Sequence, residues 1–488
     1  YLGNLLNGAD IVAPGAVTGS VTVVAGLIGA HSDMTFGSPL GLFSISGWAW
    51  PGTLTAPTAA TIMSRGDFAA DVNLTGADAR GNSVNVFYCL GSLDGAELTL
   101  AGGAGTVMAN SWNTGSLTAV QATTVMIRGN MGANVTMTGQ NAAGISLNML
   151  YAIGNVTGSV VDLAGAAGSI IANSWTTGSL NATQASTVMI RGDMGVNVTL
   201  TGQNTLGISL NMLYAMGNVT GSAVDLAGAA GVIYAGSWTG GSIQAQYVNS
   251  LVTIRGGFSA DVNLTGVNAA GNSLTLLSAA GTVSSDSIAL AGAAGTIIAT
   301  QWAAGEFTAQ NVLTFMSRGD LTGNVTLTGQ NRLGTSVNVF YVLGEMVDGQ
   351  LRTRGGIGSA IIGSMRDSGI YACVLDGVAG MPGAGATAGE YFAQPLEGMQ
   401  TPAIRTLMIS RAAGVFENSV VSAPSMGTVI LRGVATDNED APFGLVTDTG
   451  ITMLIRYRDG AAPSMARSLD ASLIDTLPAE DDFQVVVL

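Results

Sequence analysis

Short runs of alternating apolar and polar residues recur along most of the chain. In residues 134–138, Val135 and Met137 alternate with polar neighbours, and residues 145–151 continue the same kind of pattern. Glycine or asparagine interrupts these runs every few positions. Period-2 alternation bounded by such residues indicates half-buried β-strands, whereas helical spacing and helix caps are missing from these segments. The pattern therefore predicts an all-β chain.

The strand pattern repeats after about 63 residues, a period typical of repeat proteins, whose units stack to bury a common core. Three residue types keep this interval, and we interpret their members as repeat-packing residues. They are the tryptophans Trp48, Trp112, Trp175, Trp238 and Trp302, the tyrosines Tyr88, Tyr151, Tyr214 and Tyr341, and the arginines Arg65, Arg128, Arg191, Arg255 and Arg318.

One repeat, residues 125–187, divides into three glycine-bounded stretches of about 21 residues, each with two short strand signals. This organisation predicts a parallel β-helix, or β-solenoid, with three coils per repeat. Stacked strands lie about 4.8 Å apart, so equivalent residues of successive repeats are about 14 Å apart. We therefore expect Trp175 to pack on residues of the intervening coils rather than on Trp112 or Trp238.

Three regions follow from how clearly the repeat is kept. Residues 1–60 are predicted to form degenerate N-terminal coils, residues 61–345 the repetitive β-helix, and residues 346–488 divergent C-terminal coils. Within the last region, residues 378–402 are rich in glycine and proline and predict a loop that leaves a coil. Residues 437–488 are acidic.

Composition and charge restrict the partners of the chain. It has 488 residues, of which 47% are hydrophobic and 10% charged, a balance opposite to that of disordered proteins. The 16 basic residues are all arginine, and 31 acidic residues give a net charge of −15, which argues against binding nucleic acid or an anionic membrane. Apolar runs are too short for a transmembrane helix, so we expect no membrane span.

The cellular location is inferred from the same composition. The sequence opens at Tyr1 without a methionine or a signal peptide, which we interpret as a mature or partial chain. Low charge and the absence of lysine favour an extracellular or cell-surface location. Two cysteines do not make a disulfide framework, and Cys89 occupies a position that is alanine or valine in other repeats, so we expect a buried free thiol.

Three recurring motifs have both a functional and a structural interpretation. Arg-Gly-Asp occurs at 65–67, 191–193 and 318–320, but the equivalent positions 128–130 and 255–257 end in Asn and Gly, so a corner is favoured over a cell-binding tripeptide. Thr-x-Thr pairs are typical of ice-binding β-helices, but here the pair returns only on every third coil. Asn-x-Thr sequences are either glycosylation sites or corners of the fold, and they occur at Asn73, Asn134, Asn155, Asn197, Asn218, Asn263 and Asn324.

The repeats contain few side chains that could act in catalysis. Residues 124–186 contain one acid, Asp162, and one base, Arg128, while His31 is the single histidine and stands without a neighbouring carboxylate. General acid–base catalysis needs convergent groups. We therefore expect no enzyme and assign no catalytic, cofactor-binding or metal-ligating residue. The acidic clusters Asp437–Asp440 and Glu480–Asp482 are candidate Ca²⁺ sites, although solvated loop charge is the favoured interpretation.

The repeat motifs TVMIRG, NVTLTGQN, DLAGAAG and SWTTGSL resemble those of large repetitive β-helical surface proteins of bacteria. Autotransporter passengers, filamentous adhesins and the giant repeat proteins of planctomycetes share this style. The resemblance implies secretion or display on a bacterial surface and a structural or adhesive role. It identifies no functional residue.

Our first functional hypothesis is a structural subunit that assembles head to tail into a fibre, sheath or surface layer, with itself as the partner. The predicted assembly interface joins Tyr1, Leu2 and Leu5 to Phe483, Val485, Val486, Val487 and Leu488, because β-helix ends expose unpaired backbone. A second hypothesis is a monomeric adhesin or glycan-binding passenger that uses residues 378–402 and the acidic region. A third is a polysaccharide-degrading β-helix enzyme.

Overall fold

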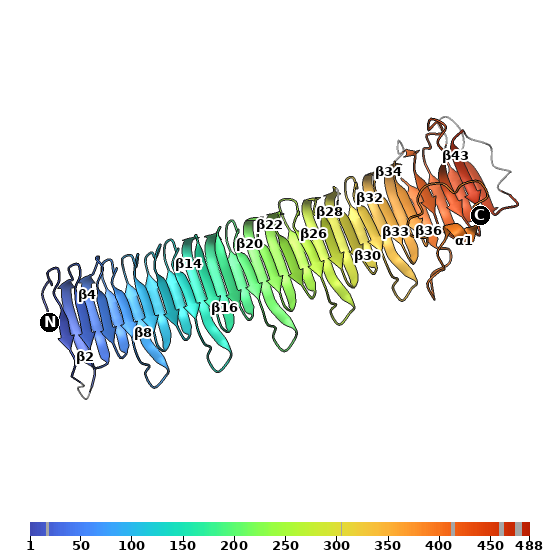
Figure 1. The fold of residues 1–488 in the computed structure, drawn as a ribbon. Helices are drawn as coiled ribbons and strands as arrows, with labels where there is room; N and C mark the ends of the chain where they lie inside the picture. Colours follow the sequence, from blue (N-terminus) through green and yellow to red (C-terminus); the bar gives the residue numbers. More distant parts are fainter. Residues whose placement is uncertain (16–18, 304, 411–414, 458–462, 474–480) are drawn as a thin grey trace. The chain divides into compact units, whose positions relative to one another are not determined.

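The computed structural model describes residues 1–15, 19–303, 305–410, 415–457, 463–473 and 481–488 (Figure 1). Two compact units divide the chain, Tyr1–Gly236 (unit 1) and Ser237–Leu488 (unit 2), so the division lies inside the repetitive segment. In each unit most strands pair in parallel with the strand about two places along the chain, which builds two sheets from successive coils. In unit 2 the last described pair of the long-strand sheet, β41 and β42, is antiparallel. The predicted all-β parallel β-helix is confirmed.

In unit 1 each coil contributes one strand to a sheet of short strands and one to a sheet of longer strands, which we call the short-strand and long-strand sheets. The short-strand sheet contains β1 (Ile11–Ala13), β3 (Asp33–Phe36), β5 (Thr53–Ala56), β7 (Asp71–Leu74), β9 (Glu97–Leu100), β11 (Ser116–Ala119), β13 (Asn134–Met137), β15 (Ser159–Leu163), β17 (Gly178–Ala182), β19 (Asn197–Leu200) and β21 (Ala223–Leu226). The long-strand sheet contains β2 (Val21–Leu27), β4 (Leu40–Gly47), β6 (Ala59–Ser64), β8 (Asn82–Cys89), β10 (Gly103–Ala109), β12 (Ala122–Ile127), β14 (Ile145–Val156), β16 (Ala166–Trp175), β18 (Ala185–Ile190), β20 (Ile208–Thr220) and β22 (Ala229–Thr239). The last three residues of β22 already belong to unit 2.

Unit 2 has the same two kinds of sheet. Its short-strand sheet contains β23 (Ser242–Ala245), β25 (Asp261–Leu264), β27 (Ser287–Leu290), β29 (Glu306–Ala309), β31 (Asn324–Leu327), β33 (Gln350–Thr353), β35 (Gly369–Ala372), β38 (Val420–Ser422), β40 (Phe443–Thr447) and β43 (Phe483–Val487). Its long-strand sheet contains β24 (Val248–Thr253), β26 (Asn272–Val283), β28 (Ala293–Trp302), β30 (Val312–Ser317), β32 (Thr335–Val347), β34 (Gly356–Arg366), β36 (Ile404–Ile409), β37 (Phe416–Glu417), β39 (Met426–Leu431), β41 (Ile451–Arg456) and β42 (Ser464–Leu469).

The repeat consists of three coils, as predicted, but the coils differ in length. Val125 is aligned with Leu150, Leu150 with Ile170, and Ile170 with Val188, which gives steps of 25, 20 and 18 residues. The longest coil carries a tight turn in which the Asn141 side chain accepts hydrogen bonds from two backbone N–H groups. Each unit therefore shows loops that project at regular intervals (Figure 1).

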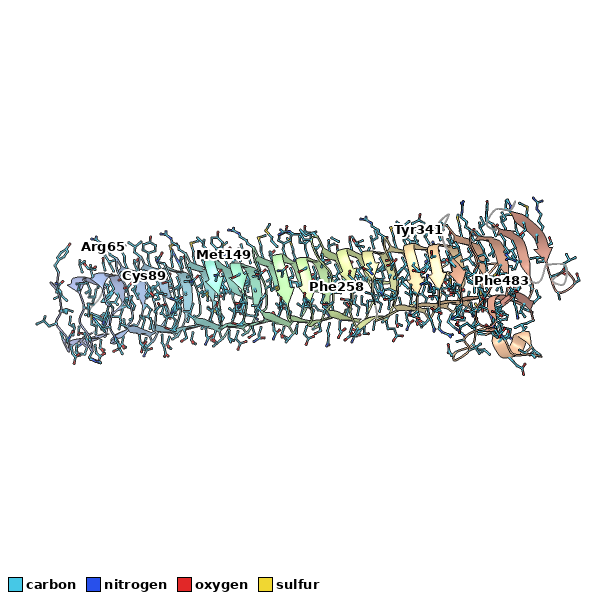
Figure 2. All side chains as sticks on the ribbon, turned by 90° about the horizontal axis from the view of Figure 1, so that it is seen from above. Arg65, Cys89, Met149, Phe258, Tyr341 and Phe483 are labelled. Carbon is cyan, nitrogen blue, oxygen red and sulfur yellow. The ribbon has the colours of Figure 1, made fainter. Side chains whose placement is uncertain are left out.

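The interior is filled by one set of alternating side chains. Val135 and Met137 of β13 are at most 1% exposed, and the intervening Thr136 faces outward. On the third side of the coil, single bridges join Trp175 to Met194 and Met194 to Val219. The tryptophans thus pack on residues of neighbouring coils and not on one another, as expected. In unit 2, Phe258 occupies an equivalent interior position, bridged to Trp238 (Figure 2).

Residues 373–403, which we call the excursion, leave the coil after β35 and return at β36. They include the short helix α1 (Ala388–Tyr391), so the predicted loop at 378–402 is confirmed but contains a helix that the sequence did not predict. The excursion lies on the outer face of the short-strand sheet, where Tyr391 and Phe392 pack against Tyr371, Val420 and Val446. Strands β35, β38 and β40 are therefore buried on both faces.

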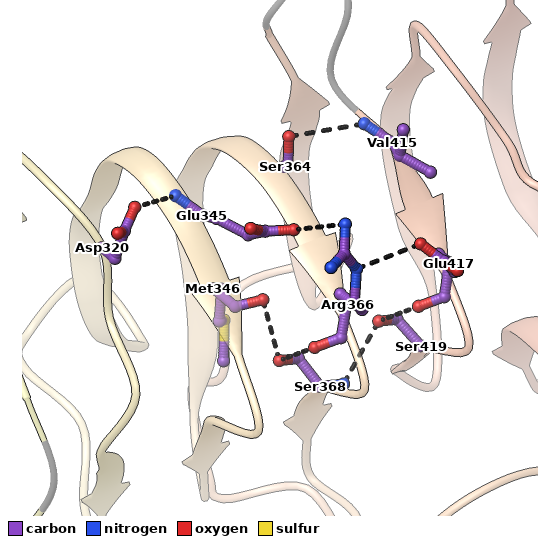
Figure 3. A network of polar contacts seen from close by, with 9 residues as sticks. All are labelled: Asp320, Glu345, Met346, Ser364, Arg366, Ser368, Val415, Glu417 and Ser419. Atoms are coloured by element: carbon purple, nitrogen blue, oxygen red, sulfur yellow. Dashed lines mark hydrogen bonds and ion pairs between the residues drawn. The ribbon is translucent and has the colours of Figure 1, made fainter.

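A polar network fixes the coil that follows the excursion (Figure 3). Arg366, at the end of β34, lies 3.3 Å from Glu345 and donates from Nε to Glu417 of β37 at 3.1 Å. Ser368 and Ser419 connect the same two coils through a hydrogen bond between the Ser368 N–H and the Ser419 hydroxyl. The Arg366–Glu417 and Ser368–Ser419 contacts join segments 51 residues apart, across the excursion.

Candidate functional surfaces

The three series of repeat residues occupy two different environments. Trp112, Trp175, Trp238 and Trp302 are at most 2% exposed, which confirms them as packing residues. The tyrosines are partly exposed and the arginines are exposed on the outer face of the long-strand sheet. The arginines therefore do not pack in the core, contrary to our expectation. They cover the surface instead: the Arg191 guanidinium lies 5.7 Å from the Tyr151 ring and donates to its hydroxyl at 3.4 Å.

A buried serine in each repeat was missed by the sequence analysis. In unit 1 the Ser209 hydroxyl donates to the Gly202 carbonyl and accepts a hydrogen bond from the Gly228 N–H at 2.7 Å, so it joins two coils inside the protein. Its equivalents make the same pair of bonds and recur at the repeat interval, which is the signal that identifies them. They are Ser83, Ser146, Ser273 and Ser336.

The Arg-Gly-Asp motifs form corners, as expected. Asp67 accepts a hydrogen bond from the backbone of Ser92 on the next coil at 2.8 Å, and Asp193 and Asp320 make the equivalent bond. Asn130, at the third position of another repeat, does the same. The third residue of the motif thus connects adjacent coils through a side-chain oxygen.

The Thr-x-Thr pairs and most of the Asn-x-Thr sequences begin on the outer face of the short-strand sheet, whereas Asn155 and Asn218 lie in β14 and β20 of the long-strand sheet. The sequon residue Asn134 accepts a hydrogen bond from the Val160 N–H of the next coil, which supports the structural interpretation of its position. Thr99, Thr118 and Thr136 are aligned on three successive coils. The Thr-x-Thr pair itself returns with the repeat, but threonine occupies its column more often than every third coil. The spacing argument in the sequence missed this because coils have unequal lengths.

The titratable groups that drew attention in the sequence are dispersed. His31 is exposed at a corner with φ of 54°. Cys89 and Cys373 are free and buried, and burial raises the pKa of each thiol to about 11, which keeps both protonated at neutral pH. No group of three His, Cys, Asp or Glu residues that would suit a metal ion occurs within the described ranges.

The two acidic clusters of unit 2 lie next to each other. Asp482 accepts hydrogen bonds from the backbone N–H groups of Asn438 and Asp440, and the Thr436 hydroxyl donates to Asp481. Glu480 lies outside the described residues. These carboxylates are used to tie the loop 436–440 to the start of β43.

A pocket of about 340 Å³ opens between the short-strand sheet of unit 2 and the beginning of the excursion. Arg352 lies 4.5 Å from the Tyr371 ring and donates to the Val378 carbonyl at 2.6 Å, which holds its guanidinium in place. Arg354 makes no ion pair or side-chain hydrogen bond with the described residues. The pocket is lined by Thr326, Leu327, Thr328, Arg352, Thr353, Arg354, Tyr371, Val374 and Asp376.

The predicted assembly residues differ in accessibility. Phe483 packs on Phe443 and Phe416 and lies under the Arg456 guanidinium, so it is only 5% exposed. The Phe483 side chain is therefore not available to a partner, contrary to our prediction. The partly exposed residues are Val485, Val486, Val487, Leu488 and Leu5, and the exposed ones are Tyr1 and Leu2. Leu488 also packs against the cluster beneath the excursion.

These features define the class of protein as a parallel β-solenoid built from repeated coils. Comparison with known proteins finds no matching family model, no matching curated protein and no matching solved structure. The resemblance of the repeat motifs to bacterial surface proteins therefore stays a prediction. Among the described residues, no helix has the length and hydropathy needed to cross a membrane.

Proposed function

We propose that this protein is a structural subunit of an extracellular bacterial fibre, sheath or surface layer, in which copies join head to tail. The observation that supports this most directly concerns the two outermost strands of the described short-strand sheets. Strand β1 pairs with β3 alone, and β43 pairs with β40 alone. A strand with one unpaired edge offers a row of N–H and C=O groups to another strand.

The hydrogen bonds of β43 show which backbone groups are available. Phe443 donates to the Asp482 carbonyl, and Leu488 donates to the Thr447 carbonyl. N–H groups along a strand point alternately to its two sides. The N–H groups of Gln484 and Val486 therefore face β40, and that of Val485 faces away from it. A parallel strand such as β1 of another copy would continue the ladder at this edge.

Replacing Val485 with proline should abolish head-to-tail polymers, because it removes an outward N–H and leaves the ladder to β40 intact. Negative-stain imaging and sedimentation of purified protein measure the effect. The matched control is Val485→Ala, which shortens the side chain but keeps the N–H and should still polymerise. This pair is preferable to deleting residues 483–488, because deletion also removes the buried Phe483.

Two outcomes would contradict head-to-tail assembly. The first is a wild-type protein that forms only isolated particles at concentrations of tens of micromolar. The second is a Val485→Pro variant that forms filaments as long and as abundant as those of the Val485→Ala control.

A second candidate function, a surface adhesin that binds glycans, is favoured by the pocket below the excursion. The guanidinium groups of Arg352 and Arg354 line the pocket and suit an anionic sugar, although the net charge of the chain is −15. The N–H donors of the Arg354 guanidinium are available to hydrogen-bond such a sugar. We expect Arg354→Ala to weaken binding of a carboxylated or sulfated glycan by about 10- to 100-fold, as loss of a charge-assisted hydrogen bond implies. Arg318→Ala, at an exposed position of a repeat, is the control. Equal glycan binding by both variants, or no binding by the wild type, would exclude this site.

A further inference from the structure

The outer face of the long-strand sheet in unit 1 carries a continuous stripe of large side chains, one per coil. Coil-to-coil alignment places Tyr88, Met108 and Met126 in one line, followed by Tyr151, Ile171 and Met189. We call the whole line, from Met63 to Tyr234, the Met/Tyr stripe. At its end the Tyr214 and Tyr234 rings stack, with their centroids 4.5 Å apart. Its members are partly exposed, although they are large and apolar or aromatic.

Further apolar side chains widen this stripe on both sides. Leu90 and Ile153 are 45% exposed and Met216 is 39% exposed, each two residues after a stripe position, while Val86 and Met212 lie two residues before one. Figure 2 shows Met149, another flanking residue, projecting outward. Contiguous apolar surfaces of several hundred Å² are rare on monomeric proteins and typically mark a contact with another molecule.

The opposite outer face of the same unit has a different character. On the short-strand sheet the aligned outward residues include Thr118, Thr136 and Asp162. Along one margin of the stripe lie Arg65, Arg128 and Arg191, and Asp67 and Asp193 follow two of them at the corner. The even-numbered strands from β2 to β22, which form the long-strand sheet, contain no acidic residue. The stripe therefore belongs to an apolar face that has arginines along one margin.

In unit 2, a segment of the chain itself covers apolar side chains on the outer face of a sheet. There the excursion buries Tyr371, Val420 and Val446 on the outside of the short-strand sheet. In unit 1 no described segment lies over the stripe in this way. The stripe is therefore accessible to another molecule.

We propose that a second copy of this chain covers the stripe, with the two long-strand sheets packed face to face and the two chains running in the same direction. The stripe repeats every three coils, so a second copy presents the same sequence of side chains at the same spacing of about 4.8 Å per coil. About nine coils, each contributing three outward positions over about 17 Å, give roughly 700 Å² per partner. This is close to the roughly 800 Å² per partner of a standard stable interface.

The arginine margin determines the relative direction. If a two-fold axis runs along the stack of coils, the arginine margin of one copy faces the opposite margin of its partner, which carries Thr61, Thr106 and Thr124. If the copies run in opposite directions, arginine faces arginine, and like charges repel. The parallel arrangement is thus favoured. It deepens the proposed self-assembly by adding a lateral contact, and it does not depend on the head-to-tail contact.

The test uses the Val485→Pro chain, in which head-to-tail contacts are blocked, and measures its mass by sedimentation. We expect a dimer that Met126→Lys with Tyr151→Lys weakens at least 100-fold. The matched control, Thr118→Lys with Thr136→Lys, adds the same charge on adjacent coils of the other outer face and should stay dimeric. A monomeric parent chain, a dimeric stripe variant, or equal dissociation of both variants would overturn the proposal.

Cross-linking tests the direction separately. In the parallel arrangement every stripe position lies opposite its own copy, so both Met126→Cys and Met189→Cys should be joined by a short bifunctional thiol reagent. In the opposite direction, at most one of the two positions lies near its own copy. Cross-linking of one variant alone, or of neither, contradicts the parallel pair. The native cysteines should not react with the reagent because both are buried. Filaments from the wild type together with a monomeric Val485→Pro chain would reject the lateral contact and retain head-to-tail assembly.

Discussion

Replacing Trp175 with alanine should lower the free energy of unfolding by about 3–5 kcal/mol, the range measured for large aromatic residues removed from protein cores. The backbone of Trp175 pairs with Val156 and Met194 on the adjacent coils. The Trp175 side chain is fully buried, and its indole N–H donates to the Thr177 carbonyl at 3.1 Å. Its loss leaves a cavity that the stiff, hydrogen-bonded coils cannot close. Because a solenoid is stabilised by contacts between neighbouring coils, the adjacent coils should open together.

Chemical denaturation followed by circular dichroism measures this loss. Trp50 provides the control, since it is 60% exposed, and Trp50→Ala should change the free energy of unfolding by no more than about 0.5 kcal/mol. Similar losses for the two variants would mean that the tryptophan series does not form the core.

Ser209→Ala should lower the free energy of unfolding by about 2–4 kcal/mol, although it removes a single oxygen atom. The hydroxyl is 1% exposed and is the partner of both the Gly202 carbonyl and the Gly228 N–H. Alanine leaves both backbone groups buried and unpaired, and each unsatisfied group costs about 1–3 kcal/mol. A larger residue at Gly228 does not substitute for the serine, since an added Cβ would lie 2.6 Å from the Gly207 carbonyl oxygen.

The same denaturation experiment separates this effect from ordinary loss of a hydroxyl. Ser186, on β18, is exposed, and Ser186→Ala should be nearly neutral. A Ser209→Ala variant as stable as Ser186→Ala would show that the serine does not connect the coils.

The sequence predicted the architecture because the repeat interval and the strand alternation both depend on the same coil. It could not predict coil lengths of 25, 20 and 18 residues, since glycine occurs both at corners and within strands. The repeat interval alone also does not distinguish buried residues from exposed ones. Trp175 and Arg191 recur equally regularly, yet one is buried and the other is exposed.

The candidate surfaces were harder to predict for a physical reason. The alternation in residues 145–151 assigns Met149 and Tyr151 to the apolar face of β14, which is normally the face toward the core. Here only the inner face is covered by the described chain, so the outward residues Met149 and Tyr151 form part of an exposed surface. Ser209 was missed because a serine within a strand normally indicates a solvent-facing position. The pocket at Arg354 depends on the path of the excursion, which alternation does not encode.

Distances between spin labels test the central claim, that one repeat corresponds to three stacked coils, most directly. Arg65, Arg128 and Arg191 are exposed in unit 1, so cysteine-substituted pairs can be labelled there while the native thiols stay buried. Six coils at about 4.8 Å predict about 29 Å between positions 65 and 191, twice the roughly 14 Å between 65 and 128. Double electron–electron resonance measures these two distances, and a ratio near two supports the solenoid. Equal distances, or a distance between 65 and 191 far from 29 Å, would contradict it.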